Sequence, residues 1–337
     1  MSSIIPMTRT VHQQQNSRLM QLPQELRDQI YDYTFSSTSP SFGRDFPGQL
    51  VHASGPSRSA LALLRSCHRV RDEVDGDWLG QVTFQFGDPK DMLDKLTDLP
   101  AGIRSQIRHL RIYGASLKLT IEDDECYFRT AQALKLLPNL QLDVLTVIGD
   151  NLSNCAYDTL NMLVRFGGGW KELHFFSFDS KLLGYADKMR YFGAHDDMNN
   201  RYMRLPQPAD WQETMNERDG EASKPSVTVY RSKDSSTLGS VFQPDKREVM
   251  VQAFGPDQDA QTYGRAEDSD LMRPGEVEKE ILVVVKRGKG VDYAEKDVPT
   301  YVGVDDIRWS FDMRTWKEIK AYQEELFDDS DDEGSVE

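Results

Sequence analysis

Strand-like apolar segments alternate with helical segments in the middle of the chain, and this alternation limits the possible folds more than any other feature. The segments VTFQF, HLRIY, DVLTVIG and KELHFFSF begin at residues 82, 109, 143 and 171. The first three are followed by stretches with apolar residues at helical spacing. Such alternation predicts an α/β fold built from β-α units with a parallel sheet, arranged as a short solenoid or an open sheet.

Two of these units share a sequence pattern. LPAGIRSQIRHLRI and LPNLQLDVLTVI both open on Leu-Pro and end on a Leu-x-Val/Ile strand, which is typical of irregular leucine-rich repeats. An α/β layer without a true repeat is the alternative. Between HLRIY and DVLTVIG, the sequence predicts an acidic loop followed by a helix that includes Tyr127, Ala131, Leu134 and Leu137.

The segment LPQELRDQIYDYTF, residues 22–35, predicts an N-terminal helix. Pro23 suits its first turn, and Leu26, Ile30 and Tyr31 are expected on one face. A polar segment rich in turn-forming residues follows it, and a second helix is predicted over residues 59–79, weakened near its end by Gly76.

The C-terminal half is less regular. SVTVYR and EILVVVKR predict strands at 226–231 and 280–287, and the polar stretch between them predicts loop. A helix is expected over 315–327, opened by a capping box of Thr315 and Glu318. The predicted organisation is therefore: 1–17 disordered, 18–80 a helical module, 81–190 β-α units, 191–275 irregular and partly disordered, 276–327 a strand and a helix, and 328–337 an acidic tail.

Charge and cysteine content narrow the classes of partner. The 337 residues carry a net charge of −15, which disfavours nucleic acid and anionic membranes as main partners. The three cysteines are widely spaced without a CxxC pair, which argues against a disulfide framework or a zinc site. There is no signal-peptide pattern and no long apolar run, so we expect a soluble protein of the cytoplasm, the nucleus or both.

The sequence contains no strong pattern of a catalytic, cofactor-binding or metal-binding site, and we expect no catalytic residue, cofactor or metal. Gly167–Gly169 lack the Lys and hydroxyl of a phosphate loop and predict a turn. His109 and His174 lie beside predicted strands, without a third ligand. An enzyme using the loop around His195, with Asp196 and Asp197, or around Arg287 is the remaining catalytic alternative.

The tail DDSDDE places Ser330 among carboxylates, which suits an acidophilic kinase. A solubilising tail and contact with a basic partner are the two other interpretations.

The chain resembles the F-box motif in the form common among fungal F-box-like proteins. The first part of the motif is matched by Leu22, Pro23, Glu25, Leu26, Ile30 and Tyr31. The second part is matched by Leu64, Cys67, His68, Val70, Glu73 and Trp78, and the strand that follows by Thr83, Phe84 and Phe86. The match covers about a fifth of the chain and departs from the family in the polar insert between Phe35 and Ala60.

The resemblance implies a non-enzymatic adaptor. Leu22, Pro23, Leu26, Ile30 and Tyr31 would dock on the Skp-type adaptor of a cullin–RING ubiquitin ligase, and the β-α units would hold a protein substrate. The alternative is a scaffold in which the same helices only cap the solenoid. An adaptor predicts an exposed apolar patch on the first helix, whereas a cap predicts that these side chains are buried.

Overall fold

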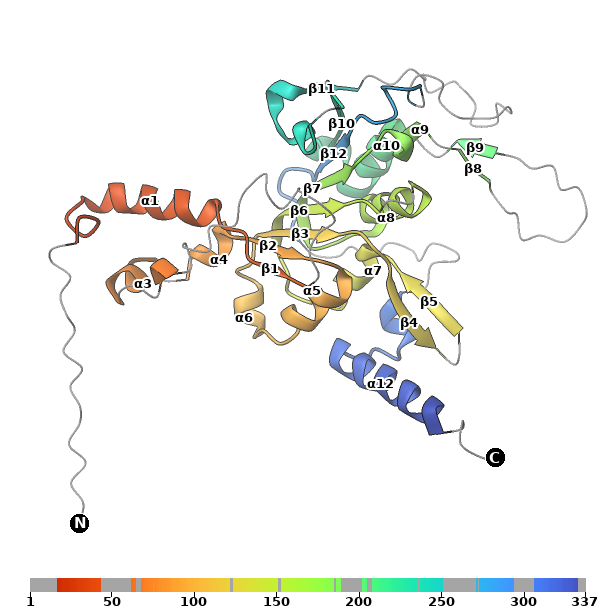
Figure 1. Cartoon of the computed structure of the whole chain (residues 1–337), viewed down its shortest axis with the longest axis horizontal. Coiled ribbons are helices and arrows are strands. Elements are labelled where there is room, and N and C mark those ends of the chain that lie inside the picture. Colours follow the sequence, from red (N-terminus) through yellow and green to blue (C-terminus); the bar gives the residue numbers. More distant parts are fainter. Residues whose placement is uncertain are drawn as a thin grey trace, which may run out of the picture.

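Eight strands form one open sheet, in the order β1-β2-β3-β6-β7-β12-β10-β11 (Figure 1). The strands are β1 (Ser41–Phe42), β2 (Thr83–Phe86), β3 (His109–Tyr113), β6 (Leu142–Ile148), β7 (Trp170–Ser177), β12 (Ile281–Lys286), β10 (Ser226–Ser232) and β11 (Arg247–Val249). This computed structural model describes residues 17–43, 62–64, 68–74, 76–121, 124–150, 153–184, 186–188, 202–204, 208–235, 237–250, 271, 273–293 and 306–332.

The sheet has a parallel part and an antiparallel part. From β1 to β7 neighbouring strands run parallel, whereas β12, β10 and β11 add to β7 as an antiparallel edge. The predicted α/β class and the mostly parallel sheet are therefore confirmed. Of the two predicted arrangements the structure shows an open sheet, and it does not confirm a solenoid.

Helices cover one face of the sheet. In Figure 1 a layer of helices runs along one side of it, formed by α5 (Pro89–Leu96), α7 (Thr130–Leu134), α8 (Ser153–Phe166) and α10 (Pro208–Asp219). Leu110, Leu145, Leu173 and Val285 are register neighbours on four adjacent strands, and all four are buried in the main core. Parallel strands connected by helices need such apolar side chains on the covered face.

The other face has a smaller apolar cluster. Ile148, Phe176 and Leu282 lie on this face, where the 3-10 turn η3 (Ser240–Phe242) packs on them. The rings of Phe176 and Phe242 stack with centroids 5.1 Å apart.

The C-terminal helix α12 (Trp316–Asp332) joins the body through side-chain hydrogen bonds. Trp316 Nε1 donates to Asp94 of α5 at 2.8 Å. Glu318 accepts from the backbone N–H of Thr315 at 2.7 Å, which is one of the two bonds of the predicted capping box, and it also accepts from the Thr315 hydroxyl at 2.7 Å. Among the described helices, none has the length and apolar character needed to cross a membrane.

The strands expected from the sequence are confirmed, but several other expectations are wrong. The stretch expected to be loop between β10 and β12 contains the strand β11 and the turns η3 and η4 (Pro244–Lys246), and α12 continues past the expected end at 327 to Asp332. The expected acidic loop contains a hairpin, β4 (Leu117–Ile121) and β5 (Asp124–Phe128), so Tyr127 is on a strand and not on a helix. Residues 208–219, expected to be irregular, form α10. The helix expected over 59–79 is broken at Gly76, whose φ of +85° suits glycine, so α3 (His68–Val74) and α4 (Trp78–Gln81) are separate.

The remaining elements complete the described chain. They are α1 (Gln24–Ser36), α6 (Ala101–Arg104), α9 (Lys181–Gly184), η2 (Glu221–Ser223), η4 (Pro244–Lys246), α11 (Ile307–Ser310) and the hairpin β8 (Ala186–Lys188)–β9 (Tyr202–Arg204). Residues 1–16, 189–201, 251–270 and 333–337, which include most of the predicted disorder, lie outside the described residues.

Candidate protein-docking site

Helix α1 begins directly after Pro23, whose φ of −53° already suits a helical entry. Glu25 lies in the first turn, where a carboxylate interacts favourably with the helix dipole. In Figure 1 this helix extends away from the sheet, next to α3 and α4.

One side of α1 packs inward. Arg27, Tyr31 and Phe35 recur every four residues and are all buried. The ring of Phe35 lies 6.3 Å from the ring of Trp78, at the start of α4. This row attaches the helix to the rest of the molecule.

A polar cluster centred on Glu73 of α3 fixes the rotation of α1. The Glu73 carboxylate accepts hydrogen bonds from Arg27 Nε and Nη2, both at 2.9 Å, and from the Tyr31 hydroxyl at 3.0 Å. Arg69 Nε donates a fourth hydrogen bond to this carboxylate, at 2.8 Å. Burial opposes ionisation of Glu73, but these donors outweigh it and lower the pKa of the carboxyl group.

The opposite side of α1 is apolar and exposed. Leu26, Ile30 and Tyr33 keep 45%, 38% and 78% of their surface accessible. Together with Leu22, which is half-buried, they line a shallow groove of about 300 Å³ that Gln29 and Thr34 complete. We call the four side chains Leu22, Leu26, Ile30 and Tyr33 the outer face of α1.

The predicted docking residues divide between the two sides. Leu22, Leu26 and Ile30 belong to the outer face, and Pro23 is exposed where the helix begins. The prediction that Tyr31 shares their face is wrong, because one residue beyond Ile30 turns by about 100° around the helix and reaches the buried row. Tyr33 was missed, although its spacing of three from Ile30 was a signal.

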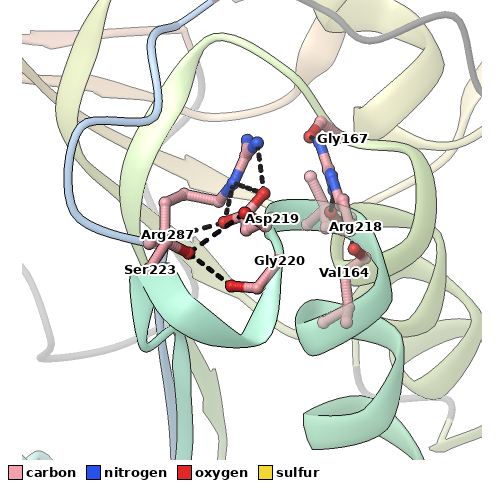
Figure 2. Close-up of polar contacts among 9 residues, drawn as sticks. Val164, Gly167, Arg218, Asp219, Gly220, Ser223 and Arg287 are labelled. Atoms are coloured by element: carbon pink, nitrogen blue, oxygen red, sulfur yellow. Dashed lines mark hydrogen bonds and ion pairs between the residues drawn. The ribbon is translucent and has the colours of Figure 1, made fainter.

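Arg287 lies in a buried ion pair (Figure 2). Its guanidinium contacts the Asp219 carboxylate at the end of α10, with Nη2 to Oδ1 at 2.8 Å, and the two side chains are 1% and 0% exposed. Asp219 also accepts from the Gly288 N–H at 2.8 Å. Burial opposes ionisation of Asp219, but the bonds from Arg287 and Gly288 outweigh it and lower the carboxyl pKa.

Arg218 lies next to this ion pair and binds the C-terminal end of α8. Its guanidinium donates to the carbonyls of Val164 and Gly167 at the end of α8, as Figure 2 shows. Those carbonyls have no partner within the helix, so Arg218 caps α8. The guanidiniums of Arg218 and Arg287 lie 5.9 and 5.6 Å from the Trp170 ring centroid. The contacts of Arg287 are thus internal to the fold.

The other candidate positions do not form a common site. Gly167–Gly169 connect α8 to β7, with Gly169 at a φ of +79°, as the predicted turn requires. His109 and His174 lie on β3 and β7, which β6 separates. In the described part of the chain no three His, Cys, Asp or Glu side chains group as metal ligands would.

Two predicted positions cannot be placed in a site. The segment from His195 to Asp197 lies outside the described residues. Ser330 belongs to the end of α12, and its side chain also lies outside them.

The chain matches no family model, no curated protein and no solved structure. The class that the fold defines is a mixed α/β protein with an open, mostly parallel sheet.

Proposed function

We propose that the protein is a non-catalytic interaction adaptor, and that the outer face of α1 docks on the Skp-type adaptor of a cullin–RING ubiquitin ligase. The observation that carries this proposal is the exposure of Leu26, Ile30 and Tyr33 on one side of a helix whose other side is already packed. An amphipathic helix that presents apolar side chains at this spacing suits insertion into an apolar groove of a partner.

The distribution of burial favours docking over a purely capping role. A cap needs its apolar side chains inside, and Tyr31 and Phe35 meet that need. Leu26 and Ile30 do not, although Glu73 holds the helix in a defined rotation. The scaffold alternative remains the second candidate, since the buried row alone would account for it.

The test is a pull-down of the purified full chain with purified Skp-type adaptor. A Leu26→Asp, Ile30→Asp double variant places charge in the proposed interface, and we expect binding to fall by tenfold or more. The matched control is Asp28→Ala, an exposed position on a third side of α1, which should bind like the wild type.

Circular dichroism of each variant separates docking from folding. A folded double variant that loses binding supports the docking role. No binding by the folded wild type contradicts the proposal. A double variant that unfolds would assign Leu26 and Ile30 to the core and support the scaffold alternative.

A further inference from the structure

A cavity of about 410 Å³ lies at the edge of the sheet where β6 and β7 begin. Leu134, Leu137 and Leu140 line its apolar side, and Lys135, Tyr293 and Arg308 line its polar side. In open α/β sheets, enzymes bind ligands at the other edge, beyond the carboxyl ends of the strands. This cavity is therefore a separate surface from the position expected for an enzyme site.

Two cations of the cavity wall are fixed by a carboxylate behind them. Asp306 Oδ2 lies 3.0 Å from Lys135 Nζ and 2.6 Å from Arg308 Nη2. The Asp306 side chain is buried, whereas those of Lys135 and Arg308 remain 19% and 32% exposed. Lys135 and Arg308 therefore present positive charge to the cavity, whereas the negative charge of Asp306 is buried.

Two more cations lie near the ring of Tyr293, outside the cavity lining. Lys171 Nζ and the Arg108 guanidinium lie 4.4 and 5.6 Å from the centroid of its ring. The hydroxyl of Tyr293 donates to Asp143, and its carbonyl accepts from the Gly169 N–H at 3.1 Å. The ring is thereby held in place close to both cations.

The charge balance around the cavity is opposite to that of the chain. The cavity lining holds two cations, Lys135 and Arg308, and one carboxylate, Asp292. Over the whole chain, 55 acidic residues outnumber 40 basic ones. An anionic ligand therefore meets local attraction here within an otherwise repulsive surface.

Exposed apolar side chains continue the surface beyond the cavity. Trp309 follows Arg308 directly, and the Met313 N–H donates to the Arg308 carbonyl at 2.6 Å. Both side chains are more than half exposed. Asp312 and Met313 adopt φ of +49° and +61°, a left-handed conformation that non-glycine residues rarely hold and that is often found at binding surfaces.

We propose that this cavity binds a peptide segment of a partner protein in which an apolar side chain is followed closely by a carboxylate or phosphate. The leucine wall takes the apolar side chain, and Lys135 with Arg308 takes the anion, since a guanidinium matches carboxylate and phosphate geometry. The apolar surface at Trp309 and Met313 suits an extended ligand. Only the identity of the partner as a ubiquitylation substrate rests on the proposed function; the binding does not need α1.

Labelled nonapeptides and the purified full chain test the proposal by fluorescence polarisation. The peptides have a Gly/Ser background, a central Leu, and Asp, phosphoserine or Lys two positions later. We expect the Asp and phosphoserine peptides to bind. The Lys peptide, and an Asp peptide with Gly in place of Leu, should bind at least about tenfold more weakly, which corresponds to the loss of one favourable contact.

Variants locate the binding. Arg308→Gln and Lys135→Met should each weaken the acidic peptides about tenfold, and Asp292→Asn should strengthen them by removing a repelling charge. The matched control is Lys181→Met, because Lys181 is half-exposed, pairs with Asp179 and follows the opposite end of β7. Should Lys135→Met fail to fold, Lys135→Arg keeps the charge and should retain binding, with Asp292→Asn as the second readout.

The outcomes are separable from those of the α1 test. The Leu26→Asp, Ile30→Asp variant should bind the peptides like the wild type. Equal binding of the Asp and Lys peptides, or equal effects of Lys181→Met and Lys135→Met, would overturn the proposal. If free 4-phenylbutyrate displaces the labelled peptide at a concentration equal to that of the peptide, the cavity would be assigned to a small organic acid. That result would also overturn the proposal.

Discussion

Arg27 of α1 and Glu73 of α3 form a two-point hydrogen-bonded ion pair, with Nε to Oε2 and Nη2 to Oε1 both at 2.9 Å. The planar guanidinium and the planar carboxylate align the two helices as well as attach them. With Arg27 held inward, the 3.6-residue period directs Leu26 and Ile30 outward. The orientation of the candidate docking surface therefore depends on Glu73.

Replacing Glu73 should disturb docking without touching the outer face of α1. In Glu73→Leu, Arg27 loses its ion-pair partner and Tyr31 loses its acceptor, so we expect the thermal midpoint to fall by a few degrees. Binding to the Skp-type adaptor should weaken in parallel. Differential scanning calorimetry and the pull-down measure the two effects.

Arg69→Ala is the control, because Arg69 is 58% exposed and its pair with Glu73 is screened by solvent. An effect as large as that of Glu73→Leu would show that the Arg27 contact does not orient α1.

The ion pair of Arg287 and Asp219 should be essential for stability. Arg287→Met leaves the Asp219 carboxylate buried without its cation, and we expect the free energy of unfolding to fall by about 3–5 kcal/mol. The adjacent Lys286→Met breaks an exposed pair with Glu172 and should change it by less than about 1 kcal/mol. Urea denaturation compares both variants.

A double variant checks the mechanism of that loss. Arg287→Met, Asp219→Asn removes both charges and should be more stable than Arg287→Met alone. If the double variant is the less stable of the two, the cost arises from packing around Trp170 and not from an unpaired charge.

Asp306 should make stability depend on pH in the acid range. Burial opposes ionisation of Asp306, but hydrogen bonds from Arg308 and Lys135 outweigh it and lower its pKa from 3.8 to about 2. The folded state therefore binds fewer protons than the unfolded state between these values. The resulting stability, on the order of 2 kcal/mol, is present above pH 3.8 and is lost as the pH falls through about 2.

Asp306→Asn tests this assignment. The variant should be less stable at neutral pH, and its free energy of unfolding should change less than that of the wild type between about pH 4 and pH 2. Denaturant unfolding at several pH values measures the slope. An unchanged slope would mean that other carboxyl groups account for the acid dependence.

Gln323 attaches α12 to the β4–β5 hairpin, because its side-chain amide bonds the backbone of Thr120 as a neighbouring strand would. Its amide accepts from the Thr120 N–H at 2.6 Å and donates to the Thr120 carbonyl at 2.7 Å. Gln323→Ala should expose both backbone groups, lower stability by about 1 kcal/mol and accelerate hydrogen exchange at the Thr120 amide. Glu324→Ala, at a neighbouring position of the helix, should leave that amide protected.

Local patterns were sufficient for most of the sheet. The strands beginning at residues 109, 143, 171 and 226 were predicted to within a residue or so, because their apolar side chains either alternate or run together as buried strands require. The β4–β5 hairpin was missed because the acidic residues at its turn suggested a loop, although LKLTI alternates. Helix α10 was missed even though Trp211 and Met215, four residues apart, are both fully buried.

Long-range relationships were beyond these patterns. The apolar run of β12 predicts a buried strand, but its place beside β7 depends on a partner more than a hundred residues away. The cavity has the same origin, because Lys135 and Asp306 meet only through folding. Pairings of this kind involve two separate segments, and neither segment alone encodes the other's position.

The sequence by itself determined the class of the fold and the presence of an amphipathic helix at residues 24–36, because hydrophobic periodicity acts within each segment. It could not determine which side of that helix is buried, since both sides carry apolar residues. Only the tertiary structure decided this, through Glu73 and Trp78, which meet Arg27, Tyr31 and Phe35 and leave Leu26, Ile30 and Tyr33 at the surface. Burial depends on what lies opposite a side chain, and that is a property of the assembled fold.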